Sequence, residues 1–269
     1  MNQTSFYDQQ SQKYSPSKTI KLHRHGLKKL FSFDDRFLAV VNKLAEQIQN
    51  FNQKKPCPPK PSWPPKLQQR RRRRRIKILD VGCGDGFYEK ELLKQGIKNC
   101  QFYGVDLSPK QLQKVKKIFY QTNQLNIDSQ KLPFPNNFFD MVILSEILEH
   151  LLYPQPALNE AQRVLKKGGL LFLTVPNVAA LQIRFSLFFT GCSPLINYPQ
   201  NEQHIRFFTI KDIEKLISMK KIYQTGVGSL FFDRWNFPFR LPTPRFLQIF
   251  INRFFPNLSL GLLFVFQKT

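Results

Sequence analysis

Short apolar segments alternate with helical segments from residue 76 to the end of the chain. Apolar runs of about four to eight residues are typical of buried strands, and the segments between them repeat apolar positions at helical spacing. Strands buried on both faces and joined by helices indicate a parallel sheet covered on both sides. The pattern therefore predicts a doubly wound α/β fold. Expected strands are 76–81, 101–106, 125–128, 140–145, 170–175 and 258–268, with helices at 88–96, 109–122 and 157–167.

The N-terminal part follows a different pattern. Residues 31–51 place apolar side chains along one helical face, whereas residues 52–75 are rich in proline and end in six arginines, Arg70 to Arg75. Proline cannot continue a helix, so this second segment is predicted to run extended. We expect an N-terminal extension with one helix (1–51), a Pro/Arg-rich linker (52–75) and one main domain (76–269).

The charge balance adds an expectation about partners. Lys and Arg number 41 against 18 Asp and Glu, a formal net charge of +23. Such an excess favours contact with nucleic acid or with an anionic membrane surface. The four cysteines lack CxxC spacing, which indicates free thiols of a reducing compartment. The N-terminus lacks the apolar core of a signal peptide, and no apolar run is long enough to span a membrane. We expect a cytoplasmic protein that could contact an anionic membrane peripherally.

The segment IKILDVGCGDGF holds the candidate chemistry. A predicted strand runs directly into Gly82, Gly84 and Gly86, which suit a sharp turn where a ligand approaches bare backbone. A dinucleotide fingerprint would need glycine where Phe87 stands, and no GK[ST] follows for a nucleoside triphosphate. The turn therefore predicts a nucleotide-like ligand of another kind.

Two carboxylates flank this turn. Asp80 precedes the glycines, where its charge would repel a pyrophosphate and favour a cationic ligand. Asp106 ends the next predicted strand, in place to accept hydrogen bonds from both hydroxyls of a ribose. The pair predicts a ligand with a positive charge and a ribose.

Taken in order, the motifs resemble those of class I methyltransferases that use S-adenosylmethionine (SAM). DVGCGDG and GVDLSP look like the first two motifs of that superfamily. The resemblance covers about residues 76–217 and implies a Rossmann-like, mostly parallel seven-stranded sheet with SAM as cofactor. The later segments that agree in order and spacing are NIDSQKLPFPNNFFDMVILSEILEHL, EAQRVLKKGGLLFLTVPN and HIRFFTIKDIEKLI.

The resemblance assigns roles to residues at the strand ends. Asp80 would position the methionine amino group, Asp106 the ribose hydroxyls, and Asp128 the adenine amino group. Ser145 and Glu146 would lie near the sulfonium and the acceptor. The expected cofactor set is Asp80, Gly82, Cys83, Gly84, Asp85, Gly86, Asp106, Leu107, Asp128, Ser129, Ser145 and Glu146, and no metal is expected.

The acceptor side is less defined. His150 and His204 are candidate general bases because an unperturbed imidazole titrates near physiological pH, although each could instead only brace a loop. Segment 177–208 is expected to form an acceptor-side insertion or lid. Its apolar residues indicate either an apolar substrate or a helix that only packs on the sheet. A predicted helix at 244–255 carries an apolar stripe that would suit a membrane interface, with packing on the core preferred.

Three functions remain open on sequence. The favoured one is methyl transfer to a small-molecule, quinone, lipid or glycan-linked acceptor, at oxygen. The second is an RNA or protein methyltransferase docked through the arginine run, although that run lacks the aromatic residues of a base-stacking surface. The third is a non-catalytic partner protein, similar to the methyltransferase-like component of bacterial methionine biosynthesis.

Overall fold

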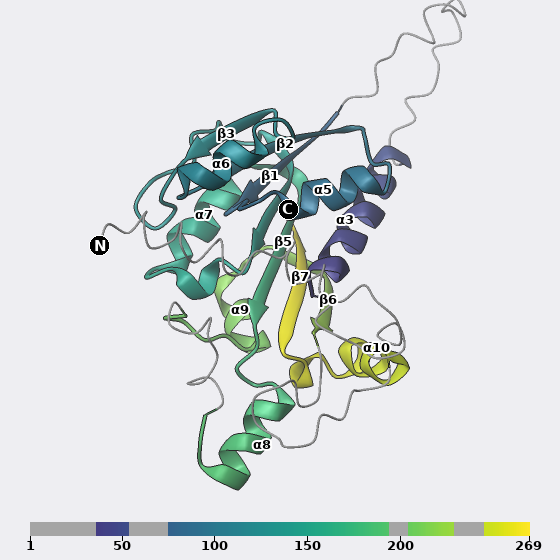
Figure 1. Cartoon of the computed structure of the whole chain (residues 1–269), viewed down its shortest axis with the longest axis vertical. Coiled ribbons are helices and arrows are strands. Elements are labelled where there is room, and N and C mark those ends of the chain that lie inside the picture. Colours follow the sequence, from purple (N-terminus) through teal and green to yellow (C-terminus); the bar gives the residue numbers. More distant parts are fainter. Residues whose placement is uncertain (1–35, 54–74, 194–203, 229–244) are drawn as a thin grey trace, which may run out of the picture.

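The computed structural model describes residues 36–53, 75–193, 204–228 and 245–269. One seven-stranded sheet runs through it in the order β3-β2-β1-β4-β5-β7-β6 (Figure 1). The first five strands are parallel, and β7 lies antiparallel to both β5 and β6. The predicted Rossmann-like, mostly parallel fold is confirmed. The strands are β1 (Ile76–Val81), β2 (Cys100–Asp106), β3 (Gln121–Gln124), β4 (Phe139–Ser145), β5 (Leu165–Pro176), β6 (Lys220–Val227) and β7 (Gly261–Gln267).

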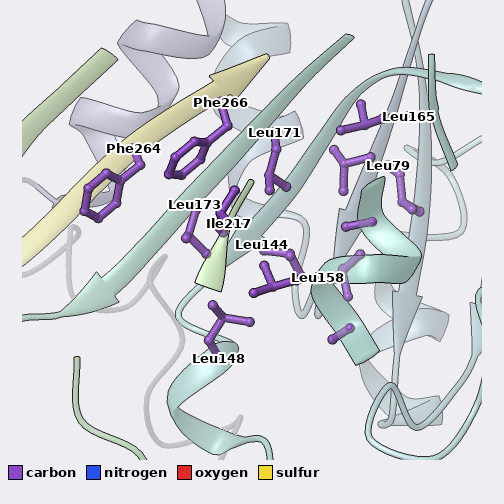
Figure 2. Close-up of a cluster of buried hydrophobic side chains, with 14 of the residues drawn as sticks. Leu79, Leu144, Leu148, Leu158, Leu165, Leu171, Leu173, Ile217, Phe264 and Phe266 are labelled. Atoms are coloured by element: carbon purple, nitrogen blue, oxygen red, sulfur yellow. The ribbon is translucent and has the colours of Figure 1, made fainter. Parts of the chain in front are cut away.

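Side-chain alternation along the strands builds a separate core on each face of the sheet. In β1, Ile76 and Ile78 belong to one buried cluster, whereas Leu79 and Val81 belong to the other. The second cluster, shown in Figure 2, joins leucines of β4 and β5 to phenylalanines of β7. Full burial of each such side chain stabilises the fold by about 1.5–3 kcal/mol.

Helices cover both faces, as the sequence predicts (Figure 1). The cluster that contains Leu79 packs against α7 (Pro154–Val164) and α9 (Ile210–Leu216). The opposite cluster packs against α3 (Arg36–Gln53), α5 (Phe87–Lys94) and α6 (Pro109–Val115). The periodic apolar face of the N-terminal helix is thus part of the core, and the predicted residues 31–35 of that helix lie outside the described part of the chain.

Local signals account for where several helices begin. Ser108 accepts a hydrogen bond from the backbone N–H of Gln111, and Pro109 follows it at the first helical position of α6. Thr209 and Asp212 form a reciprocal capping box at the start of α9. These hydrogen bonds from Thr209 lower the pKa of Asp212.

Three predicted boundaries are wrong. The helix expected at 109–122 ends at Val115, and the strand expected at 125–128 is a turn. The strand lies instead at Gln121–Gln124, where a polar edge segment pairs with the end of β2. The strand was not predicted because its residues are polar, and an edge strand can be polar because it buries little surface.

The third wrong boundary is the end of the helix expected at 157–167. That helix stops at Val164, and β5 begins at Leu165 and passes through the two glycines that were expected to close the helix. Gly168 has φ +74°, and a Cβ on Gly169 would lie 2.8 Å from the Lys166 carbonyl oxygen. The glycines therefore permit an irregular strand start next to β4.

The C-terminal helix α10 (Arg245–Phe254) turns its apolar stripe outward. Its polar residue Gln248 is 5% exposed and donates a hydrogen bond to the carbonyl oxygen of Gly228. The expected stripe is therefore not the face that packs beside β6; its residues Phe246, Ile249, Phe250 and Phe254 are all at least half exposed. None of the described helices combines the length and the apolarity that crossing a membrane requires.

Candidate active site

The glycine turn connects the end of β1 to α5 at the carboxyl edge of the sheet. Gly82 donates its backbone N–H to the Val105 carbonyl oxygen at 2.8 Å, so the turn is tied to the end of β2. Gly82 has φ +74°, and a Cβ there would lie 2.1 Å from the Cδ1 atom of Ile147. A Cβ added at Gly84 would have its nearest neighbour 4.0 Å away, so the backbone there is accessible to a ligand.

Asp106 is held in a fixed position at the end of β2. Its Oδ2 atom accepts the backbone N–H of Gly84 and its Oδ1 atom accepts that of Ser108, each at 2.8 Å. A carboxylate oxygen can accept a second hydrogen bond, so a carboxylate positioned in this way can also receive hydroxyl groups. Leu107 follows, and its carbonyl oxygen accepts a hydrogen bond from Gln124.

Two buried acids lie beneath the turn. Asp80 is 2% exposed and Glu89, in the first turn of α5, is 1% exposed. Burial, followed by the nearby Glu89 and Asp106 carboxylates, raises the pKa of Asp80 well above its usual value. Burial likewise raises the pKa of Glu89 to about 8. Burial and the closeness of the acids therefore favour the protonated form of each carboxyl group, and a cationic ligand group nearby would favour ionisation.

Cys83 fills space inside the turn. Its side chain is 4% exposed, and a Cβ on Gly104 would lie 2.8 Å from its Sγ atom. Burial raises the pKa of the thiol far above its usual value, so it does not form a thiolate near neutral pH. The neighbouring Asp85 accepts a hydrogen bond from Lys90 through its backbone carbonyl.

Hydroxyl groups connect α5 to the ends of β4 and β5. The Tyr88 hydroxyl lies 2.5 Å from the Ser145 hydroxyl, which in turn lies 2.7 Å from the Thr174 hydroxyl. Glu146 follows with φ +54°, an uncommon backbone conformation for a side-chain-bearing residue that is concentrated at functional sites. Its backbone N–H donates to the carbonyl oxygen of Thr174 at 3.1 Å.

Asp128 lies in the turn after β3 and reaches the segment that follows β4. Its two carboxylate oxygens lie 3.0 Å and 3.3 Å from the backbone nitrogen of Leu152, which donates to them. Ser129 is exposed beside it. The carboxylate thus joins two loops at the carboxyl edge of the sheet.

The two candidate bases lie next to each other. His150 ends the short helix η2 (Leu148–His150), and its ring centroid is 4.9 Å from that of His204. Between them lies Glu149, which is 1% exposed, with its Oε1 atom 3.9 Å from the Nε2 atom of each histidine. The backbone carbonyl of Glu149 accepts the N–H groups of Ile205 and Arg206, which brings the two segments together.

The segment expected to form an acceptor-side insertion, 177–208, has its two ends paired. Asn177 forms a parallel β-bridge with Phe208, and the backbone N–H of Val178 donates to the Phe208 carbonyl oxygen at 3.1 Å. The buried Asn177 amide also donates to the carbonyl oxygens of Asn257 and Ser259, at 3.0 Å and 2.8 Å. The two ends of the segment are therefore held together, and Asn177 is also bonded to the segment that precedes β7.

The chain is similar to known methyltransferases. Residues 79–173 match the family model of a methyltransferase domain. The chain is similar to a demethylmenaquinone methyltransferase of Protochlamydia amoebophila, with 31% identity over 173 residues that span 57% of this chain and 72% of that protein. The chain belongs to the class I SAM-dependent methyltransferases. This methyltransferase is also similar to a 2-methyl-6-phytyl-1,4-hydroquinone methyltransferase of Oryza sativa subsp. japonica, with 33% identity over 136 residues.

The extent of these matches is partial. The match to the rice protein spans 49% of this methyltransferase and 39% of the length of that relative. The solved structure of a SAM-dependent methyltransferase from Archaeoglobus fulgidus has the same fold, with a TM-score of 0.51, 13% identity, and coverage of 87% of this chain and 97% of that chain. The match to the family model covers residues 79–173, which include the glycine turn and Asp106.

The residues present fit SAM, the methyl donor of the family. The backbone at Gly84 is open, and Asp106 is fixed beside it in a position suited to ribose hydroxyls. The buried Asp80 and Glu89 pair offers negative charge for a cationic ligand group. Sequence reasoning missed Glu89 and Tyr88, although both follow the glycine turn within the first turn of a predicted helix.

Proposed function

We propose that this methyltransferase transfers a methyl group from SAM to a hydroxyl of a small, quinol-like or lipid-linked acceptor. The proposal rests on the contact between the glycine turn and Asp106, in which the Asp106 Oδ2 atom accepts the backbone N–H of Gly84 at 2.8 Å. A protein that used this fold without binding a ligand would not need accessible backbone at Gly84 beside the half-buried Asp106 carboxylate.

The chain's own residues would bind and orient the reactants. Asp106 would accept the ribose hydroxyls, and Gly84 would let the ligand approach the backbone. The Asp80 and Glu89 pair would attract the α-amino group, and Ser145 would border the reacting end. When bound, SAM supplies an electrophilic methyl group on a sulfonium. Methyl transfer depends chiefly on alignment and exclusion of water, and a nearby base helps to remove the acceptor's proton.

His150 and His204 support transfer to a hydroxyl. His150 lies five residues after Ser145, the residue assigned to the reacting end, and the His204 ring lies 4.9 Å from the His150 ring. Glu149 lies 3.9 Å from each, and a neighbouring carboxylate stabilises the imidazolium that forms when histidine accepts a proton. Either histidine would thus serve as the group that removes the acceptor's proton.

The insertion supports an apolar acceptor. Helix α8 (Leu181–Thr190) buries Ile183 but exposes Phe188 by 83% and Phe189 by 64%. Exposed aromatic residues in a row are typical of a surface that meets an apolar ligand or partner. The similar rice and Protochlamydia proteins carry names that refer to 2-methyl-6-phytyl-1,4-hydroquinone and to demethylmenaquinone.

The proposal predicts turnover with a matched acceptor panel. Purified protein incubated with SAM should methylate a prenylated hydroquinone faster than the same ring without its prenyl chain, because α8 offers apolar contact. Mass spectrometry would detect the product, and NMR would distinguish an O-methyl from a C-methyl group. Faster methylation of an RNA oligonucleotide or a peptide would support the docked RNA or protein methyltransferase instead, and SAM binding without any transfer would support a non-catalytic partner.

We further propose that α10 contacts an anionic membrane surface. Its exposed residues Phe246 and Phe250 are 75% and 50% exposed, and the chain carries a net charge of +23. Replacing both with serine should reduce binding to vesicles that contain phosphatidylglycerol, by about tenfold for each phenylalanine removed. Co-sedimentation measures this binding, with Tyr120→Ser, an aromatic 67% exposed at the distant β3 edge, as the control. Equal binding of the double variant and the wild type would contradict the proposal.

A further inference from the structure

Glu149, His150 and His204 form a cluster of potential metal ligands. One ligand atom from each residue lies within 4.8 Å of the other two. The Glu149 side chain is 1% exposed, whereas those of His150 and His204 are 22% and 12% exposed. The cluster therefore combines a buried carboxylate with two partly exposed imidazoles.

The backbone holds these ligands together across a long sequence separation. The Glu149 carbonyl oxygen accepts the N–H of Ile205 at 2.9 Å and that of Arg206 at 3.1 Å. The Arg206 side chain then donates to the Leu152 carbonyl oxygen at 2.5 Å. These three bonds fix the segment that carries His204 against η2, so the site is organised before any ligand arrives.

The spacing and the donor set suit a transition metal ion. The Glu149 Oε1 atom lies 3.9 Å from the Nε2 atom of each histidine, a separation that admits a cation between them. Zn²⁺ binds imidazole nitrogen and carboxylate oxygen at about 2.0–2.2 Å, which places neighbouring ligands about 3–4 Å apart. Two imidazoles and one carboxylate favour zinc, iron, cobalt or manganese over magnesium, which prefers oxygen ligands.

We infer that Glu149, His150 and His204 bind a divalent first-row transition metal ion through three protein ligands. The two partly exposed histidines leave coordination positions open on the solvent side. The site follows β4, whose last residue, Ser145, borders the reacting end in the proposed function. If the proposed function holds, an open position would receive a hydroxyl oxygen of the acceptor, and the inferred metal would orient the acceptor and lower the pKa of that hydroxyl. His150 and His204 would then act as metal ligands in place of proton acceptors, and the hydroxyl proton would pass to solvent water.

A different arrangement could occupy the same space. Protonated histidines could pair electrostatically with the buried carboxylate and hold η2 against the His204 segment without any metal. The two arrangements differ in measurable ways, because only a metal site binds a cation with defined stoichiometry and gives a ligand-field spectrum.

Metal titration of the full chain tests the inference. Protein freed of metal with a chelator would be titrated with Co²⁺ and Zn²⁺ by calorimetry, and the Co²⁺ complex would be followed by its visible absorption. We expect one equivalent to bind, with affinity reduced roughly 100-fold in Glu149→Gln and in His204→Ala. His150→Gln is the alternative variant if circular dichroism shows that either of these is unfolded.

Two controls make the result specific. A His23→Ala/His25→Ala double variant removes the other two histidines of the sequence and should bind the metal as the wild type does. Asp106→Ala should lose SAM binding but keep metal binding, so failure of the metal site and failure of the methyltransferase proposal are distinguishable. Absence of stoichiometric binding, or equal Co²⁺ affinity and spectra in the wild type and the Glu149 and His204 variants, would overturn the inference.

Discussion

Replacement of Asp106 with alanine is expected to weaken SAM binding by about 100-fold or more. The carboxylate accepts backbone N–H groups from Gly84 and Ser108, so its loss releases the glycine turn and removes the proposed ribose acceptor. Hydrogen bonds to a charged group contribute about 1.5–3 kcal/mol each, and about 1.4 kcal/mol corresponds to a tenfold change in affinity. Calorimetric titration with SAM and with S-adenosylhomocysteine measures the loss.

Asp140→Ala is the matched control for this experiment. Asp140 is also a partly buried aspartate on a strand, and it accepts a backbone N–H from Lys77 and an ion pair from Lys166. It lies at the amino end of β4, away from the glycine turn, so its replacement should leave SAM affinity unchanged. Affinity within about threefold of wild type in the Asp106 variant would contradict the assigned cofactor site.

Gly82→Ala is expected to abolish SAM binding and to lower stability. A Cβ at this position would lie 2.1 Å from the Cδ1 atom of Ile147, and the backbone φ of +74° disfavours any side chain. The backbone conformation alone costs about 1–3 kcal/mol, and relief of the clash must displace either the turn or the segment after β4. Thermal unfolding and calorimetric titration together measure the two effects.

Gly96→Ala is the control that distinguishes the energetic cost of a positive φ from the effect of the Gly82 Cβ clash with Ile147. Gly96 has φ +80°, but a Cβ there would meet no atom within 4 Å, and it follows α5 away from the strand ends. This variant should lose stability while SAM affinity is retained. Partial recovery of SAM binding in Gly82→Ala/Ile147→Ala would confirm the clash as the cause, whereas equal SAM affinity in Gly82→Ala and Gly96→Ala would refute it.

The sheet could be predicted from sequence because its central strands are apolar on both faces. Segments such as 140–145 and 170–175 have few polar residues to confuse the pattern, and each lies within the observed strand. The edge strand at Gln121–Gln124 could not be found in this way, since its four residues are all polar and partly exposed. Its pairing with β2 depends on backbone hydrogen bonds that no side-chain pattern reveals.

The cofactor side was more predictable than the acceptor side for a related reason. Asp80, Gly84 and Asp106 lie within two short motifs, so their proximity follows from two adjacent parallel strands. His150 and His204 were each recognised as candidates, but their contact depends on backbone bonds between Glu149 and a segment more than fifty residues later. No metal was expected from the sequence, and the metal site is proposed from this contact alone.

The bridge between Asn177 and Phe208 has a consequence for how this enzyme family can diversify. A segment whose two ends are already paired can change in length at little thermodynamic cost, because closure entropy grows only with the logarithm of loop length. Residues 178–203 could therefore be exchanged as a cassette, with the two anchoring residues and the segment that carries His204 kept. New acceptors could be selected in such chimaeras while the glycine turn and Asp106 continue to bind the same methyl donor.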